Sequence, residues 1–302
     1  MWNISDYYTL PLDTWIQDFV ANWLVPNFRP FFRTVEWPVQ ELLVALNWLL
    51  HTIPFPIFLV GGILGAWRAA GKRVALLTLA SIICIDILGL WDDAMTTLAM
   101  VFTAVTFCAL VGIPLGVLAA RSNSIAAILR PILDVMQTIP SFVYLVPIVM
   151  LFGIGLVPGI IATIIFSFPP IVRLTNLGIR QVSAELTEAA EAFGSTRLKM
   201  LIDIQIPLAL PTIMAGLNQT LMMALSMVVM AALIGAGGLG LTVYTSIGRL
   251  QVGSAALGGI GIVLIAIVLD RITQSIGSTS FAARRRMSSN TRENMPIVGA
   301  KK

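Results

Sequence analysis

Long apolar stretches separated by short polar segments dominate the pattern of hydrophobic and polar positions along the chain. The stretches cover approximately residues 42–67, 74–91, 94–119, 130–152, 156–175, 212–234 and 252–275. Stretches of this length can form helices that cross a bilayer of about 30 Å. Pro54 and Pro56 interrupt the first one, which therefore predicts an amphipathic helix leading into a shorter crossing at about 53–67. The pattern predicts an all-α polytopic membrane protein with about seven transmembrane helices.

The two ends of the chain depart from this pattern. Residues 1–40 are rich in Trp, Tyr, Phe and Pro but contain no spanning stretch. They predict an aromatic arm at the membrane interface, on the periplasmic side. Residues 277–302 are basic and end in a segment with little apolar content, which predicts a solvated cytoplasmic tail.

The composition supports a membrane protein. Of the 302 residues, 57% are hydrophobic and only 11% are charged, and the mean hydropathy is +0.90. A soluble domain would carry about a quarter charged residues. The formal net charge of +4 is small, and basic residues such as Arg68, Lys72 and Arg73 sit at the ends of apolar stretches. This arrangement is typical of membrane topology and argues against a nucleic-acid partner.

The distribution of charge orients the predicted helices. The basic segments fall on one side of the membrane if the helices alternate, namely Arg68–Arg73, Arg121–Arg130, Arg173–Lys199 and Arg284–Arg286. Acidic residues such as Asp18, Asp92 and Asp93 fall on the other side. The positive side is cytoplasmic. We therefore expect the N-terminus outside, the C-terminus inside, and residues 176–211 in the cytoplasm.

Two motifs resemble nucleotide-binding sites, but their surroundings and spacing do not fit such sites. Gly235, Gly237 and Gly240 satisfy GxGxxG, but they follow a helical apolar stretch and no acidic residue lies about 20 positions further on. The segment 65–73 resembles a P-loop, yet its spacing is one residue too long and it ends in Arg73. His51 is the only histidine, so no two-histidine metal site and no catalytic triad is expected. The sequence predicts no catalytic residue, no metal and no cofactor on this chain.

A charged amphipathic segment stands between the fifth and sixth stretches, within residues 176–211 (the coupling loop). Leu186, Ala190 and Phe193 share one helical face in it. Gly194 interrupts the pattern, and Ser195 or Thr196 can cap a second short helix. We expect Pro207 to end that second helix. Two short helices hinged at a glycine predict a surface knob that another protein grips.

The order of residues in this segment resembles the EAA loop of ABC importer permeases, apart from Ile206, where the family usually has Leu. In that family the loop docks into a cytoplasmic ATPase and passes on its motion. The resemblance assigns coupling to the ATPase to Glu188, Ala189, Ala190, Gly194, Ile204 and Pro207.

The sixth stretch is rich in small, polar and Met residues, which are unfavourable against lipid tails and should face other helices or a pore. Tight packing in a bundle is an equally good interpretation. Gly235 to Gly240 predict a flexible outer loop suited to a gate. The predicted translocation path consists of Asn218, Thr220, Met223, Ser226, Met227, Gly235, Gly237, Gly238 and Gly240. Gly61/Gly65 and Gly112/Gly116 are small-xxx-small pairs of the kind that pack helices together.

The resemblance extends over roughly residues 95–276, through the stretches 130–155, 164–182, 217–240 and 248–274. These are similar to the membrane subunit of the glycine betaine/proline betaine ABC importers. The resemblance implies a type I importer permease core over 94–276, with accessory helices over 41–93. It also implies a homodimer in the bacterial inner membrane, two ATPases that carry ATP and Mg, and a separate periplasmic substrate-binding protein.

The sequence thus predicts a permease that moves a small methylated-ammonium osmolyte by alternating access. Glycine betaine, proline betaine, choline and trimethylamine N-oxide belong to this class. The alternatives are a secondary carrier or channel, or a membrane enzyme, and neither has an ATPase partner. Only Phe142, Tyr144 and Phe166 are aromatic candidates near the path, too few for a cation–π cage. We therefore expect substrate affinity to reside in the binding protein.

Overall fold

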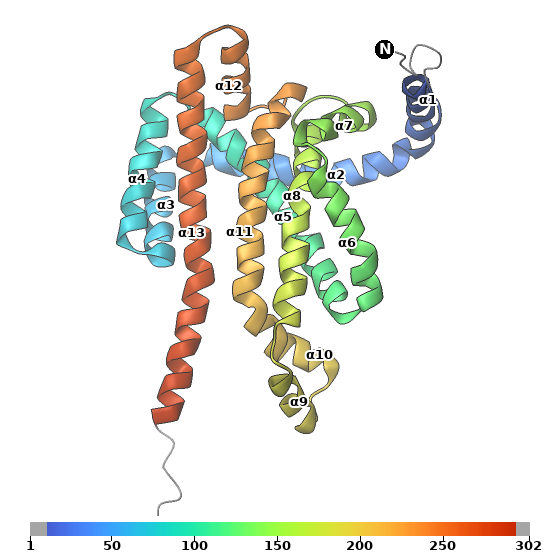
Figure 1. The fold of residues 1–302 in the computed structure, drawn as a ribbon. Helices are drawn as coiled ribbons and strands as arrows, with labels where there is room; N and C mark the ends of the chain where they lie inside the picture. Colours follow the sequence, from blue (N-terminus) through green and yellow to red (C-terminus); the bar gives the residue numbers. More distant parts are fainter. Residues whose placement is uncertain (1–10, 294–302) are drawn as a thin grey trace, which may run out of the picture.

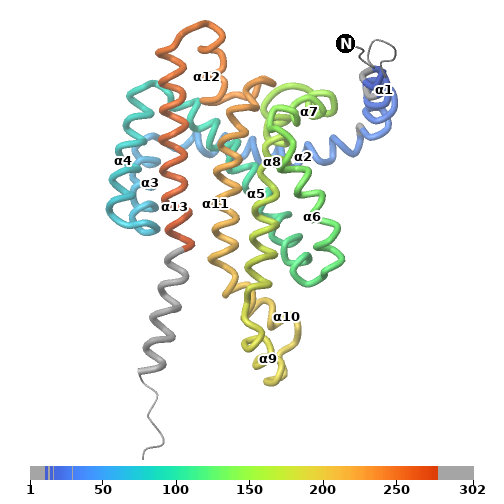
Figure 2. The backbone as a smooth tube through the Cα atoms, in the orientation of Figure 1, coloured from blue at the N-terminus to red at the C-terminus, as the bar shows by residue number. Residues whose placement is uncertain are grey.

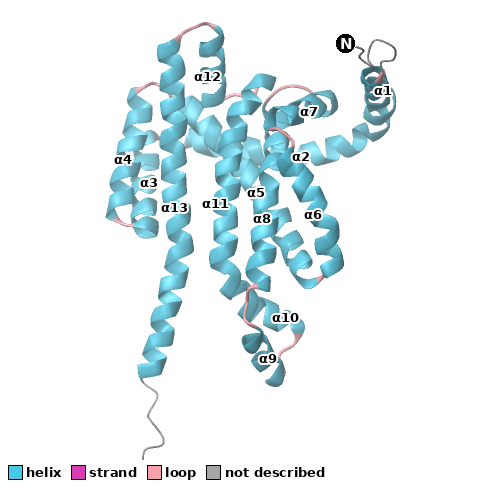
Figure 3. Cartoon of the chain, viewed as in Figure 1, coloured by secondary structure: helices cyan, strands magenta, loops and turns pink. Residues whose placement is uncertain are grey.

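The computed structural model describes residues 11–293, without the side chains of residues 13, 16, 29 and 278–293. Throughout that range the chain consists of helices joined by short loops, with no strand (Figure 3). The all-α prediction is confirmed. The long helices α5 (Trp91–Arg121), α8 (Leu156–Arg180), α11 (Ile206–Ala231) and α13 (Val252–Glu293) run along one another through the molecule (Figure 1).

The N-terminal segment is helical and lies across the bundle. α1 (Leu12–Asp18) continues through a π-helical turn (Phe19–Leu24) into α2 (Val25–Thr52), which crosses the long helices near one end (Figure 1). Trp15, Trp37 and Trp48 are exposed along it. α2 passes residue 40 without a break, so the predicted boundary between arm and accessory helices falls inside one helix.

Two predicted spans are broken helices. Between Pro30–Thr52 and α3 (Phe55–Ala70) the chain bends by 105°, as expected from Pro54. The predicted span 130–152 is not one helix, because α6 (Asn123–Thr138) and the segment Ser141–Phe152, which includes α7 (Leu145–Phe152), also meet at 105° (Figure 2). Ile139 precedes Pro140, and a residue before proline is driven out of the helical region.

The structure contains fewer candidate membrane spans than the seven predicted from the sequence. Within the described residues, four helices are long and apolar enough to cross a membrane, or up to six if each bent pair counts as one span. α4 (Lys72–Ile87) covers most of the predicted span 74–91 but has only 16 residues. At 1.5 Å per residue it is about 24 Å long, shorter than the hydrocarbon core. The count of about seven is therefore not confirmed, and the orientation of the chain stays a prediction.

Close contact between α5 and α8 forms the centre of the bundle. A Cβ atom on Gly112 would lie 2.4 Å from Cγ2 of Ile171, and one on Gly116 would lie 2.5 Å from Cβ of Thr175. The two glycines therefore let the helices approach closely, as the small-xxx-small pattern predicts. The other pair, Gly61 and Gly65, meets nothing within 4 Å in this chain.

The two ends of the bundle differ. The short helices α9 (Ala184–Ala192) and α10 (Arg197–Lys199) project as a knob beyond one end, whereas α7 and α12 (Leu239–Gly248) lie at the other (Figure 1). The two candidate functional regions therefore lie at opposite ends of the bundle, with the coupling loop at one end and the glycine-rich turn at the other.

Candidate coupling loop and translocation path

Gly194 ends α9 in a left-handed turn. Its φ is +79°, and its N–H donates to the carbonyl of Glu191 over 2.9 Å, while Ser195 N–H donates to the carbonyl of Ala190 over 3.0 Å. This pair of bonds is a Schellman motif, which requires a residue that tolerates positive φ. A Cβ atom at Gly194 would meet nothing within 4 Å. The glycine is therefore needed for its backbone conformation and not for lack of space.

The second short helix begins as predicted but does not end as predicted. Thr196 caps it, since its hydroxyl accepts a bond from the N–H of Lys199 over 3.4 Å. A π-helical turn, Met200–Gln205, then leads directly into α11. The expectation that Pro207 ends the helix is wrong, because Pro207 lies in the first turn of α11, where its missing N–H removes no bond of that helix. The wider π turn before it accommodates the proline ring.

The knob is anchored to the rest of the bundle through buried side chains and arginine bonds. Ala190, Met200 and Leu201 are buried. Arg121, at the end of α5, donates from Nη2 to the carbonyl of Arg197 over 3.1 Å. Arg180, at the end of α8, donates to the carbonyl of Ala119 over 2.8 Å. Arg121 therefore ties the knob to α5, whereas Arg180 ties α8 to α5. A displacement of the knob would act directly on α5, and α8 is bonded to α5.

The outer surface of the knob carries exposed apolar side chains next to carboxylates. Phe193 is 91% exposed, and Leu186 and Leu198 are each about half exposed or more. Glu188 and Glu191 are exposed beside them. Several large apolar side chains exposed on one small projection are typical of a surface that binds a partner. The prediction that Phe193 and Ala190 share one face is met only in part, because Ala190 turns inward and Phe193 outward.

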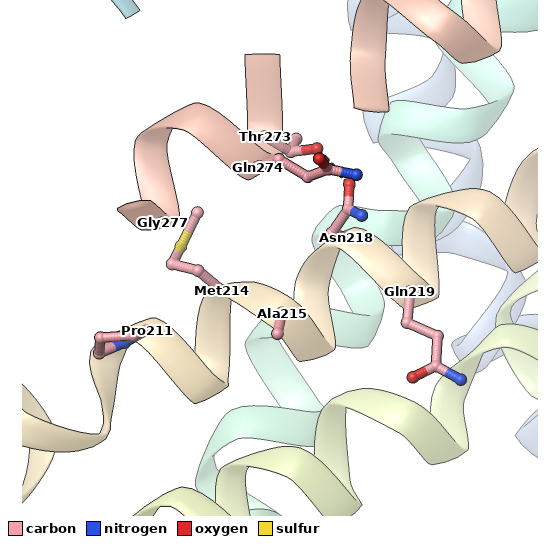
Figure 4. Close-up of a pocket in the computed structure, with 8 residues that line it drawn as sticks. All are labelled: Pro211, Met214, Ala215, Asn218, Gln219, Thr273, Gln274 and Gly277. Carbon is pink, nitrogen blue, oxygen red and sulfur yellow. Dashed lines mark hydrogen bonds between the residues drawn. The ribbon is translucent and has the colours of Figure 1, made fainter. Parts of the chain in front are cut away.

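A polar network joins α11 to α13 through the half-buried side chains of Asn218, Asp270 and Thr273 and the exposed Gln274. Asn218 donates from Nδ2 to Oδ1 of Asp270 over 3.0 Å, and its own Oδ1 accepts a bond from the Thr273 hydroxyl. Gln274 donates to the same Asp270 oxygen over 2.6 Å. In Figure 4 Thr273, Gln274 and Asn218 converge, whereas Gln219 points away from them. The network lies beside a cavity of about 440 Å³ between the two helices.

Sequence reasoning selected Asn218 but missed its partners. The available signal was Asp270, a carboxylate inside the apolar stretch 252–275. An ionisable residue inside a membrane helix is unfavourable and is retained for a specific contact. Here that contact is the pair of amide donors on Asn218 and Gln274.

Removing this carboxylate should destabilise the bundle. Asp270→Leu would remove the acceptor of the half-buried Asn218 amide, a loss of about 1 kcal/mol, whereas the exposed Gln274 amide can bond water instead. We expect a lower melting temperature of the purified permease in detergent, measured by intrinsic fluorescence. The matched control is Asp203→Leu, since Asp203 is exposed in the π-helical turn that follows α10. Equal melting temperatures for the two variants would contradict the assigned role of the network.

The other predicted path residues on α11 divide into two groups. Thr220 and Met227 are completely buried, so they pack against other helices of the same chain. Met223 is half-buried and Ser226 is exposed. Ser226 shares the open face of α11 with Ala215 and Gln219, which are also exposed. Only this open face is free to line a path or to meet a second subunit.

The glycine-rich turn is packed and not free. Gly238 has a φ of +75°, and a Cβ atom there would lie 2.5 Å from the Thr97 hydroxyl oxygen. Leu239 N–H donates to that same hydroxyl over 2.9 Å. A Cβ atom on Gly240 would lie 3.0 Å from Cα of Val229. Gly235 is exposed and Gly237 half-buried. The expected flexible loop is therefore a tight turn fixed to the start of α5.

The chain matches a known protein family. Residues 112–278 match the family described as "Binding-protein-dependent transport system inner membrane component". The class defined by the fold and the knob is thus the membrane subunit of a binding-protein-dependent importer, a transport subunit and not an enzyme.

Curated relatives narrow this class. The chain is 53% identical to the glycine betaine/proline betaine permease ProW of Escherichia coli strain K12, over 90% of this chain and 76% of ProW. It is 45% identical to the glycine betaine permease OpuAB of Bacillus subtilis strain 168, over 88% of this chain and 94% of OpuAB. It is 44% identical to the glycine betaine/carnitine permease GbuB of Listeria monocytogenes, over 88% and 95%. The chain belongs to the family of ABC importer permeases that these proteins represent.

A solved structure supports the fold. The inward-facing MetNI methionine ABC transporter matches with a TM-score of 0.56 and 24% identity, over 63% of this chain and 95% of the matched chain. At this identity the match concerns the arrangement of helices alone. It agrees with the predicted type I permease core.

Proposed function

We propose that this permease moves a compact molecule with a fully substituted nitrogen into the cell, such as glycine betaine or proline betaine. The observation that carries this proposal is the 53% identity over 90% of the chain to a glycine betaine/proline betaine permease. The substrates named for the three relatives, betaines and carnitine, share a methylated ammonium group and a carboxylate. Choline and trimethylamine N-oxide share only the methylated nitrogen and are further candidates.

The mechanism proposed is alternating access by two copies of this chain. Each copy presents its knob to a separate cytoplasmic ATPase, which carries ATP and Mg. Movement of the ATPases would enter through Glu188 and the exposed ring of Phe193. It would reach α5 through Arg121, and α8 through the bond of Arg180 to α5. ATP drives the transition only through its different affinity for the two states.

Substrate affinity is proposed to lie mainly in a separate periplasmic binding protein. Within the described core, Phe142 is 56% exposed and Tyr144 is buried, and the centroid of the Tyr144 ring lies 6.4 Å from that of Phe166. Tyr144 also uses its hydroxyl to donate to the carbonyl of Met136 over 2.6 Å. These rings do not form an aromatic cage of the kind that binds quaternary ammonium groups tightly.

The proposal is tested by uptake into proteoliposomes. Permease and ATPase should import glycine betaine rapidly with the binding protein and about tenfold or more slowly without it. The control is an ATPase that binds but does not hydrolyse ATP. Strong and selective uptake without the binding protein would place recognition on the permease instead. Uptake of none of the methylated-ammonium compounds would exclude the proposed substrate class.

The orientation is a separate prediction, with the knob in the cytoplasm. We expect a cysteine at Ser195 to resist membrane-impermeant maleimide added to intact cells, and a cysteine at Ser254 to react. Ser254 is exposed near the start of α13, at the opposite end from the knob. Native Cys84 and Cys108 would first be replaced, because both are free thiols. Labelling at 195 from outside would reverse the topology.

A further inference from the structure

A cavity of about 440 Å³ lies between α2 and α7, apart from the predicted path and the coupling loop. Its volume falls in the range of small-molecule sites. Its wall contains a cation, Arg33, an anion, Glu36, and two aromatic rings, Phe32 and Phe152. The wall therefore combines both signs of charge with aromatic surface.

Neither charged side chain has an ion-pair partner among the side chains that the structure describes. Among the described residues, the only ion pair joins Arg173 to Asp134, and no side-chain hydrogen bond of Arg33 or Glu36 is present. The two residues are three positions apart on α2 and therefore point to the same side of that helix. Both line the cavity. A ligand that carries both a negative and a positive group can pair with each of them.

The end of α7 adds negative potential to the same cavity. Gly153, with a φ of +85°, stops the helix, and its N–H donates to the carbonyl of Val149 over 2.9 Å. In the described chain no backbone N–H from the following loop donates to the carbonyls of Met150, Leu151 and Phe152. Free carbonyls at a helix C-terminus favour a cation.

The aromatic rings suit the same kind of cation. Phe32 and Phe152 contact each other edge to face with centroids 5.4 Å apart, and both are partly exposed. A methylated ammonium group cannot donate a hydrogen bond, so it is attracted by ring faces and by carboxylate charge. Glu36, the rings and the carbonyls of α7 therefore form a cationic half-site, and Arg33 forms a carboxylate half-site.

We propose that this cavity is a weak acceptance site for a zwitterion with a methylated ammonium group and a carboxylate. The proposal rests on the proposed substrate class. α2 and α7 lie towards the end of the bundle opposite to the knob (Figure 1), where a periplasmic binding protein would release its ligand. The loop after α7 also contacts the 3-10 turn Ala232–Ile234 that follows α11, because Gly155 N–H donates to the carbonyl of Ile234 over 2.9 Å.

The test uses the full-length permease with its ATPase in lipid nanodiscs, without the binding protein. Saturation-transfer NMR would measure the binding of glycine betaine, of choline, which lacks the carboxylate, and of 3,3-dimethylbutanoate, which lacks the ammonium charge. We expect millimolar binding of glycine betaine to the wild type. Arg33→Gln should weaken glycine betaine binding about five- to tenfold and leave choline unchanged, whereas Glu36→Gln should weaken both.

Two controls separate a site from a general effect of charge. Glu41→Gln and Arg249→Gln remove exposed charges outside the cavity and should change nothing, while Arg33→Lys should retain most of the glycine betaine binding. No binding to the wild type, or equal binding by all variants, would overturn the site. Uptake by the same complex with binding protein and ATP is measured in parallel. If uptake of glycine betaine is normal but no binding to this cavity is measured, the proposed function stands and only the site is overturned. If none of the methylated-ammonium compounds is taken up, the proposed function is overturned.

Discussion

Gly194→Trp should abolish ATP-driven uptake while the permease remains folded and inserted. Gly194 has a φ of +79°, and a side chain in that conformation costs about 1–2 kcal/mol. The space around its position is open, so the indole would project from the knob and not into the bundle. It would then occupy the surface where the ATPase is proposed to dock. The measurement is glycine betaine uptake compared with ATP hydrolysis in the same proteoliposomes.

The control for this prediction is Gly194→Asn. Asparagine tolerates the left-handed conformation better than other non-glycine residues, and its short side chain should leave much of the uptake intact. Wild-type uptake by the Trp variant would contradict the role assigned to this turn. Loss of the Trp variant from the membrane would show instead that the turn is required for folding.

The turn between α9 and α10 in the coupling loop could be predicted from the sequence because its local signals agree with one another. Gly194 after an alternation of alanine and glutamate predicts a helix end, and Thr196 predicts the next helix start. Both depend only on residues within a few positions. The error at Pro207 arose because a proline in a first helical turn and a proline that ends a helix look alike when the upstream helix is short.

The parts that were missed depend on contacts between residues distant in sequence. Asp270 lies 52 positions from Asn218, and no local rule pairs an amide on one helix with a carboxylate on another. The same holds for Gly238, whose glycine-rich neighbourhood suggested flexibility, although the Thr97 side chain fixes it from a separate helix. Apolar length likewise overestimated the span at 130–152, because the bend at Pro140 leaves hydropathy unchanged.

Gly116→Leu should prevent stable folding of the permease. A Cβ atom at this position would lie 2.5 Å from Cβ of Thr175 and 2.8 Å from the carbonyl oxygen of Val172, and the backbone of α8 cannot move away as a side-chain tip can. Overpacking of this kind costs about 1–3 kcal/mol or more. Because α5 and α8 form the centre of the bundle, we expect a strongly reduced yield of monodisperse protein in detergent and a lower melting temperature.

Gly65→Leu provides a matched control, because Gly65 belongs to the same small-xxx-small pattern in α3 but meets nothing within 4 Å in this chain. It should fold with a yield and a melting temperature close to those of the wild type, since leucine is the better helix former. If Gly116→Leu also melted like the wild type, the close approach of α5 and α8 would be wrong. If Gly65→Leu folded but failed to form the proposed homodimer, the glycine pair on α3 would act between subunits, in contrast to the pair on α5, which packs within one chain.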